Sequence, residues 1–329
     1  MVTDWTRPTR FILFSLEYHR PDPILVQPRI SIGDGSMTNA FKWMNDREKI
    51  LLKSAKPLPY QTLEDGRELI IHLYLPRDLR EGELRPGFLF FNSGAWDRGS
   101  IIQFAPQALY YVDRGAICGL VEYRNRSSHP ESCPTDALRD GRAAIHCLRQ
   151  HADSLHLDPA RVIAVGGGAG ANIAASAAMR VPLPGSDPSI NAATARPNAA
   201  ILFSAILDLT KGGYGYDQFT GAAEARLASL SRSIDSGMPP MLLIHGTADR
   251  LVPCEDVADF AAKMERRRNV CELVEYEGRD QSFYNLNVDP ASYEASLATM
   301  DDFLDRHGLL KKGKDHESPH LISWREKDY

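Results

Sequence analysis

Arg161-Val-Ile-Ala-Val-Gly-Gly-Gly-Ala-Gly-Ala-Asn172 is the stretch that decides the fold of this chain. Val162 to Val165 are apolar and mostly β-branched, which predicts a short buried strand. Glycine and alanine alone fill positions 166–170, and the Ala-rich run after them predicts a helix over 171–179. A strand, a sharp glycine turn and a helix form the frame of a nucleophile elbow, G-x-S-x-G. The position of the nucleophile is Gly168, which has no side chain and therefore cannot attack a substrate.

The composition of the 329-residue chain limits its class. Hydrophobic residues make up 43% and charged residues 25%, which is ordinary for a globular protein. The net charge of −5 gives no electrostatic case for binding nucleic acid. The apolar run over 11–16 is too short for a membrane span or for the core of a secretory signal. The five cysteines contain no C-x-x-C pair and are expected to be free thiols, which predicts a cytoplasmic protein.

Strand and helix patterns alternate along most of the chain. Apolar runs predict strands over 69–75, 87–91, 116–122, 162–165, 199–207, 241–244 and 271–276. Helical patterns cover 104–112, 134–152, 171–179, 255–267 and 293–306. This alternation predicts an α/β fold with a mainly parallel central sheet and helices on both faces. We divide the chain into an N-terminal arm or cap (1–56), one domain (57–310) with a candidate lid (208–237), and a polar C-terminal tail (311–329).

A loop of small residues follows the apolar run over 87–91. Its sequence is Phe91-Asn-Ser-Gly-Ala-Trp96. Ligands of parallel α/β sheets bind beyond the carboxyl ends of the strands, where this loop lies. Ser93, Gly94 and Ala95 are small enough for their backbone N–H groups to approach an oxyanion. We place Trp96 and Ala169 in the same candidate oxyanion and cleft set. A tight turn that merely suits a strand end is the alternative interpretation.

Two further loops lie at predicted strand ends. His245-Gly-Thr-Ala-Asp249 follows the strand over 241–244, and a carboxylate there is placed to orient an imidazole. A turn-forming or capping role for Asp249 is the alternative. In the chain order Ser, Asp, His, the histidine is expected within 276–285, and the residue there is Gln281. No histidine occurs between His245 and His307.

From about residue 59 to 307 the chain resembles the α/β-hydrolase esterases of the acetylesterase, feruloyl-esterase-like and hormone-sensitive-lipase-like group. The motifs that carry the resemblance occur in the family order; they are 91–96, Val121-Glu-Tyr-Arg124, Leu157-Asp-Pro-Ala-Arg-Val162, 245–249, and Glu277-Gly with Phe283-Tyr-Asn285. The resemblance implies the α/β-hydrolase fold. It places the family's catalytic serine at Gly168, its acid at Asp249 and its histidine at Gln281. The triad is therefore degenerate, with only the acid present, and Asn92, Ser93 and Ala95 depart from the family's oxyanion loop.

These departures argue against ordinary esterase turnover. Loss of the nucleophile or the base costs a serine hydrolase about 10⁶-fold in turnover. The Gln281 amide cannot act as a general base near neutral pH. We therefore expect a non-hydrolytic pseudo-esterase that binds a small ester, acid or sugar-derived ligand in the former active-site cleft.

Two alternatives stay open. One is an enzyme of altered mechanism, such as a lyase, a dehydratase or a slow carboxylic-ester hydrolase, which keeps the oxyanion loop. It would use His129 as a substitute base, with Cys133 or Ser93 beside it. The other is an inactive structural partner in an oligomer. The sequence leaves the question of enzymatic activity open.

No cofactor and no metal are expected. The H-x-x-x-H spacing occurs once, at His316 and His320 in the polar tail, where Pro319 opposes the helix that would bring the two rings onto one face. The glycines at 166–168 lack the Lys-Ser/Thr of a P-loop, and the G-x-G-x-x-G spacing fails at Ala171. The expected partner is a small molecule, with neither nucleic acid nor a membrane, and a homo-oligomer is left open.

Overall fold

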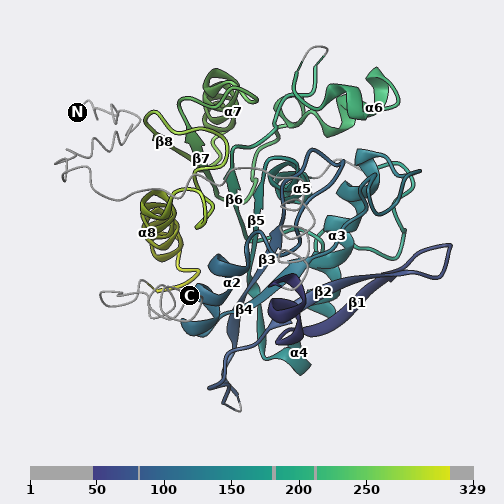
Figure 1. Ribbon diagram of the computed structural model, residues 1–329, viewed down its shortest axis with the longest axis vertical. Coiled ribbons are helices and arrows are strands. Elements are labelled where there is room, and N and C mark those ends of the chain that lie inside the picture. Colours follow the sequence, from purple (N-terminus) through teal and green to yellow (C-terminus); the bar gives the residue numbers. More distant parts are fainter. Residues whose placement is uncertain (1–46, 81, 180–182, 211–212, 312–329) are drawn as a thin grey trace, which may run out of the picture.

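A computed structural model describes residues 47–80, 82–179, 183–210 and 213–311. Eight strands form one sheet in the order β1-β2-β4-β3-β5-β6-β7-β8 (Figure 1). The β1–β2 and β2–β4 pairs are antiparallel and the other pairs are parallel. The predicted mainly parallel sheet is confirmed. The strands are β1 (Lys56–Thr62), β2 (Glu68–Tyr74), β3 (Arg85–Phe91), β4 (Ile117–Val121), β5 (Leu157–Gly167), β6 (Ala199–Phe203), β7 (Met241–Gly246) and β8 (Cys271–Tyr276).

Helices connect most of the parallel strands. The α-helices are α2 (Ala105–Asp113), α3 (Pro134–Gln150), α4 (Ala152–Leu155), α5 (Ala169–Ala178), α6 (Ala222–Ala228), α7 (Cys254–Arg266) and α8 (Pro290–Arg306). Two 3₁₀ turns, η1 (Tyr216–Gln218) and η2 (Leu230–Arg232), flank α6. Proline begins both α3 and α8, a position where the missing N–H would have no helical partner.

The sheet is buried on both faces. Phe88 and Phe90 of β3 join the core cluster that includes α2 and α8. Leu89 and Phe91 point to the opposite face, into the cluster that includes α3, α5 and α7. This alternation follows from the two-residue period of a strand. A strand between two helical layers must be apolar at every position, which explains the continuous apolar run of β3.

The structure extends the predicted elements at two places. β5 begins at Leu157 and is eleven residues long, whereas the apolar pattern predicted only 162–165. The pattern also missed β1, because Pro57 and Pro59 interrupt it. Proline lacks a backbone N–H and is tolerated in a strand at the edge of a sheet, where β1 lies. Residues 1–46 and 312–329, most of the expected arm and tail, lie outside the described residues.

One buried ion pair joins the loop after β4 to α3. The Arg124 guanidinium donates to both carboxylate oxygens of Asp140, with Nη2 2.6 Å from Oδ1. The backbone N–H of Arg124 also donates to Asp140, at 2.9 Å. Asp140 is fully buried. The motif Val121-Glu-Tyr-Arg124 therefore fixes the polypeptide that leaves the carboxyl end of β4.

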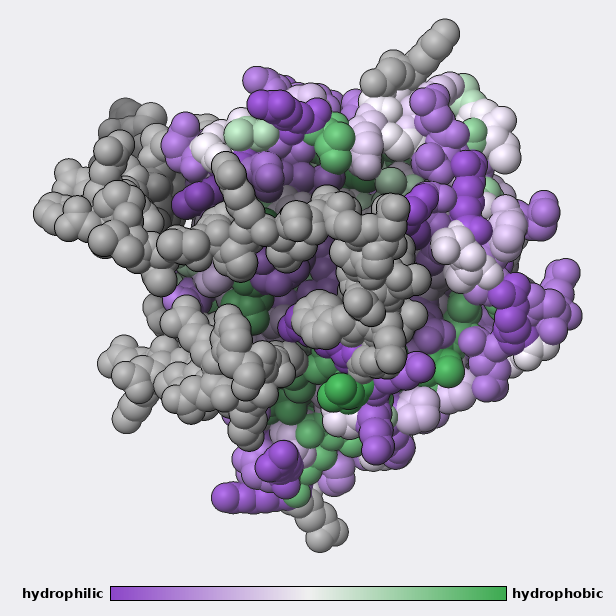
Figure 2. All heavy atoms as spheres, in the orientation of Figure 1, coloured by the Kyte–Doolittle hydropathy of each residue, from purple (hydrophilic) through white to green (hydrophobic). Residues whose placement is uncertain are grey.

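The surface is polar where the space-filling view shows it. Hydrophilic residues predominate among the coloured atoms of this face (Figure 2). Among the helices of the described residues, none combines the length and the apolar character that a membrane crossing requires.

Candidate functional site

Gly168 lies at the turn between β5 and α5. Its backbone adopts φ 52° and ψ −113°, in the left-handed half of conformational space. The Gly168 N–H donates to the Phe203 carbonyl at 2.9 Å, which holds the turn against β6. This is the sharp strand-to-helix turn of a nucleophile elbow.

The outer glycines of the elbow are required by packing. A Cβ added at Gly166 would lie 2.2 Å from the carbonyl oxygen of Gly170. A Cβ at Gly170 would lie 2.1 Å from the carbonyl oxygen of Phe91. Both contacts are with backbone atoms, which cannot move aside as a flexible side chain can. β5, α5 and the end of β3 thus approach one another so closely that only glycine fits at positions 166 and 170.

Gly170→Ala is expected to lower the free energy of unfolding by about 3 kcal/mol, because the new methyl group overlaps the backbone of β3. Urea denaturation measures the change. Gly221→Ala is the matched control: no atom lies within 4 Å of its added Cβ, and its φ is 177°. This control should lose no more than about 1 kcal/mol, the cost of replacing a glycine N-cap. Equal losses in the two variants would refute the packing argument.

Gly168, at the position where the elbow motif carries its serine, faces two side chains. A Cβ placed on Gly168 would lie 3.4 Å from the Cβ of Ser93 and 4.0 Å from Nε2 of Gln281. No other residue of the described chain comes within 4 Å of that point, apart from its chain neighbours. The structure therefore brings Ser93, Gly168 and Gln281 together. Ser93 and Gln281 are partly exposed, so this point is not sealed within the core.

Asp249 follows β7 and carries an unused acceptor. Its Oδ1 accepts hydrogen bonds from the backbone N–H groups of Leu251 (2.9 Å) and Val252 (3.0 Å). Its Oδ2 is buried and has no hydrogen-bond partner in the part of the chain that the structure describes. A buried acceptor without a donor is unfavourable by about 1–3 kcal/mol. An aspartate of a catalytic triad would be left with such an unpaired carboxylate oxygen if no imidazole donated to it.

His245 does not replace the missing histidine. Its side chain is fully buried, and Nε2 donates to the Val252 carbonyl at 3.0 Å. Burial lowers the pKa of His245 and favours the neutral ring. Nε2 lies 3.8 Å from Oδ2 of Asp249, beyond hydrogen-bond distance. The ring is thus held within the β7 loop, away from the elbow.

The loop after β3, the candidate oxyanion loop, has three consecutive residues with positive φ. Gly94 has φ 135°, and a Cβ there would meet the Arg98 carbonyl at 1.4 Å. Ala95 and Trp96 also have positive φ, at 51° and 59°. The Gly94 N–H lies outside helices and strands and has no protein acceptor in the described part of the chain. The N–H of Ala169 is the first of α5, so the helix itself gives it no partner. Gly94 and Ala169 thus each offer an open donor among the described residues.

Ser93 differs from the expectation, because its N–H is already occupied. It donates to Oε1 of Gln103 at 2.7 Å. The Gln103 amide nitrogen donates in turn to the Tyr284 hydroxyl (3.3 Å) and to Asn285 Oδ1 (3.1 Å). Gln103 therefore ties the oxyanion loop to the segment that carries Gln281. The sequence alone does not indicate Gln103, since a glutamine in a loop carries no distinguishing pattern.

Gln103→Leu should destabilise the fold by about 1–3 kcal/mol, because it removes three hydrogen bonds with little change of volume. The midpoint of thermal or urea unfolding measures the effect. Gln150→Leu serves as the control, since Gln150 is exposed at the end of α3 and its side chain has no hydrogen bond within the described residues. A Gln103 variant as stable as this control would show that the three bonds contribute nothing.

Gln281 is held by its backbone. Ser204 Oγ donates to the Gln281 carbonyl at 3.2 Å. Three residues later, Tyr284 is buried and stacks on Phe203 and Phe104, with ring centroids 4.6 and 5.7 Å apart. Its hydroxyl lies against the elbow, since a Cβ at Gly167 would meet it at 2.2 Å. Burial raises the pKa of Tyr284 to about 12, so this hydroxyl stays protonated and can only donate or accept hydrogen bonds.

Part of the candidate lid packs on the oxyanion loop. Phe219 meets Trp96 edge to face, with ring centroids 5.6 Å apart. Arg126 Nη2 donates to the Gln218 carbonyl at 2.8 Å. The segment around η1 therefore covers Trp96, although whether it opens and closes stays a prediction.

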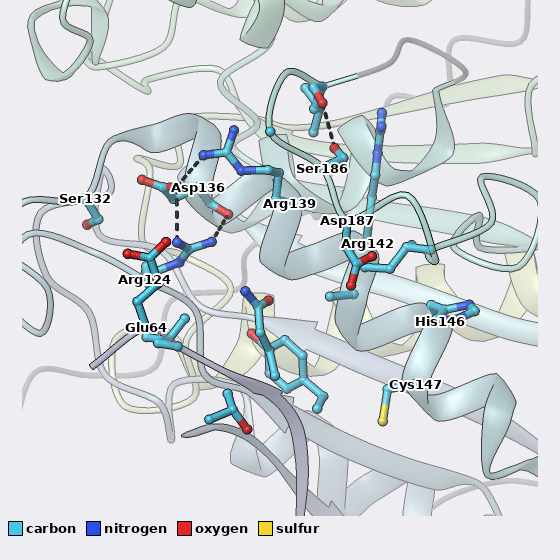
Figure 3. A pocket seen from close by; sticks show the side chains of 18 of the residues that line it. Glu64, Arg124, Ser132, Asp136, Arg139, Arg142, His146, Cys147, Ser186 and Asp187 are labelled. Carbon is cyan, nitrogen blue, oxygen red and sulfur yellow. Dashed lines mark hydrogen bonds and ion pairs between the residues drawn. The ribbon is translucent and has the colours of Figure 1, made fainter. Parts of the chain in front are cut away.

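The substitute groups His129 and Cys133 lie elsewhere. His129 lines a groove, here called the α3 groove, whose walls are residues 60–67, 124–132, α3 and 183–195 (Figure 3). None of Ser93, Gly168, Asp249 and Gln281 lines that groove. Burial raises the pKa of the Cys133 thiol, which opposes a nucleophilic role. We therefore give neither residue a part in chemistry at the elbow.

The fold agrees with comparisons to known proteins. The family model described as BD-FAE matches residues 71–264, more than half of the chain. The chain belongs to the BD-FAE family. This match places it among the α/β-hydrolase fold esterases and lipases, and the predicted fold is confirmed. The BD-FAE match includes Gly168 and Asp249 and ends before Gln281.

Solved structures are similar over most of the chain. Esterase 2 of Thermogutta terrifontis, phosphoramylated by tabun, is 34% identical with a TM-score of 0.72, covering 79% of this chain and 97% of that chain. Its butyrate-bound form is 32% identical with a TM-score of 0.74, covering 80% and 98%. The relatives of this BD-FAE chain thus include proteins named as esterases.

Curated relatives are more distant. Esterase LipQ of Mycobacterium tuberculosis is 26% identical over 214 residues, which are 60% of this chain and 50% of LipQ. Isoprenylcysteine alpha-carbonyl methylesterase ICME of Arabidopsis thaliana is 24% identical over 230 residues, which are 64% of this chain and 52% of ICME. The BD-FAE chain spans about half the length of these curated relatives.

Proposed function

We propose that this chain is a non-hydrolytic member of the BD-FAE family, a pseudo-esterase that binds a small ester, acid or sugar-derived ligand at the former active site. The observation that carries the proposal is the vacancy at Gly168. The backbone there keeps the elbow conformation, while the two side chains facing the position are Ser93 and Gln281. Neither the nucleophile nor the base of an esterase is present. Binding without hydrolysis is what this set of groups can perform.

The remaining groups suit an acyl ligand. The N–H groups of Gly94 and Ala169 are donors for its carbonyl or carboxylate oxygen. The Gln281 amide is a third donor, 4.0 Å from the point where a serine Cβ would lie. A ligand oxygen can take the volume that a serine hydroxyl would fill. Structures of Thermogutta terrifontis esterase 2 with butyrate and with propionate support a short-chain acid as the ligand class.

A labelling and binding experiment tests the proposal. Esterase 2 of Thermogutta terrifontis is phosphonylated by sarin. We expect no covalent labelling of this chain by a fluorophosphonate probe, because Gly168 offers no hydroxyl. We also expect background rates with para-nitrophenyl acetate and a saturable thermal shift with butyrate. Turnover at rates ordinary for an esterase, or stoichiometric labelling, would overturn the proposal.

A slow carboxylic-ester hydrolase is the second candidate, because the similar proteins are named as esterases and Ser93 lies beside the vacant position. Residual activity of about 10³–10⁴ over water survives in serine hydrolases that have lost triad groups. If such activity is found, Ser93→Ala distinguishes its sources. A further loss would assign it to the Ser93 hydroxyl, and an unchanged rate to the backbone donors alone.

The proposal also places the protein in the cytoplasm. All five cysteines, Cys118, Cys133, Cys147, Cys254 and Cys271, are free thiols. Free buried thiols are typical of proteins in reducing compartments.

A further inference from the structure

The α3 groove is a cavity whose lining includes none of the elbow residues. Its volume is about 1240 Å³, and the polar side of α3 forms one wall. Most cations in its walls are paired with carboxylates. Arg124 and Arg139 both pair with Asp136 (Figure 3). Arg67 pairs with Asp65.

Arg142 is the exception in this wall. No carboxylate of the described residues lies within 4.0 Å of its guanidinium. Its Nη2 donates to the carbonyl oxygens of Ser176 (3.1 Å) and Met179 (3.5 Å), beside the end of α5. Among the described residues, its Nε is buried without a partner, while Nη1 has no acceptor and is not buried. A half-buried cation with an open donor and no counter-charge therefore lines the groove.

Arg149, on the same helix, has a guanidinium whose hydrogen-bonding capacity is used at every nitrogen. It also lacks a carboxylate, but each of its nitrogens has an acceptor. Nε donates to the Pro159 carbonyl, Nη1 to the Thr194 carbonyl and Nη2 to Asn198 Oδ1. Burial lowers the pKa of Arg149 to about 10, and that of Arg142 to the same value. Burial thus lowers the pKa of both arginines alike. They differ because every guanidinium nitrogen of Arg149 has an acceptor, whereas Nη1 of Arg142 has none among the described residues.

His146 follows Arg142 by one turn of α3 and lines the same groove. Its Nδ1 lies 2.6 Å from Thr194 Oγ1, and its Nε2 has no partner in the described part of the chain. Hydrogen bonds from Ser189 lower the pKa of Asp187, and the charge of a nearby His146 lowers it further. Asp187 and His146 therefore lie close enough for an electrostatic interaction. Figure 3 shows Arg142 and His146 along α3, with Ser186 and Asp187 nearby.

We propose that the α3 groove binds a small organic monocarboxylate, held by Nη1 of Arg142, with Nε2 of His146 as the acceptor for a ligand hydroxyl, because Nδ1 of His146 donates to Thr194 Oγ1. An unpaired guanidinium gains most from a carboxylate, whose two oxygens match its planar donors. The groove also carries the acids Glu64, Glu131 and Asp187. These charges disfavour a doubly charged ligand such as phosphate, so the ligand carries a single negative charge.

Titration of lactate and of inorganic phosphate tests the proposal, with affinity from calorimetry and location from NMR shifts. Lactate should bind wild type saturably and more tightly than phosphate. Arg142→Gln should weaken lactate binding at least tenfold, the usual scale for truncating one partner of a charge-assisted pair. Arg149→Gln, the matched control, should change it less than threefold. Asp187→Asn should tighten it, because a repelling charge is removed.

Several outcomes would overturn the proposal. They are the absence of saturable lactate binding, equal affinity in wild type and Arg142→Gln, and an affinity unchanged by Asp187→Asn. Gln281→Ala separates this site from the elbow: a loss of lactate binding in that variant would assign the lactate to the elbow instead. If Arg142→Gln fails to fold, lactate binding by Asp187→Asn and by Gln281→Ala still tells whether lactate binds in the α3 groove or at the elbow.

Discussion

The double variant Gly168→Ser with Gln281→His is expected to hydrolyse para-nitrophenyl acetate about 10³-fold faster than wild type. In serine hydrolases the nucleophile and base together account for about 10⁶-fold in turnover, and we expect partial recovery. The serine Cβ fits, since its nearest neighbours would be Ser93 Cβ at 3.4 Å and Gln281 Nε2 at 4.0 Å. In the triad arrangement that the resemblance implies, the histidine would donate to Asp249, whose Oδ2 has no donor among the described residues. Steady-state rates at pH 8 measure the gain.

Each single variant should remain near the wild-type rate, because nucleophile and base act as a unit. Adding Asp249→Asn to the double variant should remove much of the recovered activity, since the imidazole loses its orienting acid. Equal activity of wild type and the double variant would show that the elbow differs from an esterase by more than these two side chains.

Asp140→Ala is expected to lower the free energy of unfolding by about 3–5 kcal/mol. The substitution leaves the Arg124 guanidinium partly buried without the carboxylate that accepts from both Nε and Nη2. It also removes the acceptor of the Arg124 backbone N–H. Guanidinium chloride denaturation measures the loss.

Asp158→Ala provides the comparison. It breaks another Arg–Asp pair, in which Arg161 Nε lies 2.6 Å from the carboxylate, but both side chains are partly exposed. Exposed pairs contribute about 0–1 kcal/mol, so this variant should be nearly as stable as wild type. Similar losses in the two variants would refute burial as the source of the effect.

The survival of the elbow frame says little about catalysis. Gly166 and Gly170 are required because β5, α5 and the end of β3 approach one another closely. That requirement does not depend on which residue occupies position 168. The fold therefore requires both glycines whatever residue stands at position 168.

Much of the candidate site could be located from sequence. Gly168, Asp249 and Gln281 follow β5, β7 and β8, and the carboxyl ends of parallel strands share one edge of the sheet. Hydrogen bonds between loops could not be predicted in this way. The bond from Ser93 to Gln103 joins residues without any shared pattern, and it removes one of the expected oxyanion donors.

By itself the sequence determined the α/β fold, the order of the parallel strands along the chain and the absence of a side chain at Gly168. Each of these depends on local residue type and periodicity, which the sequence contains directly. Only the tertiary structure decided that Asp249 Oδ2 lacks a donor, that Gln103 occupies the Ser93 N–H, and that Arg142 is left unpaired in the α3 groove. The physical reason is that a polar group is satisfied or unsatisfied by neighbours distant in sequence, and packing alone brings those neighbours within hydrogen-bond distance.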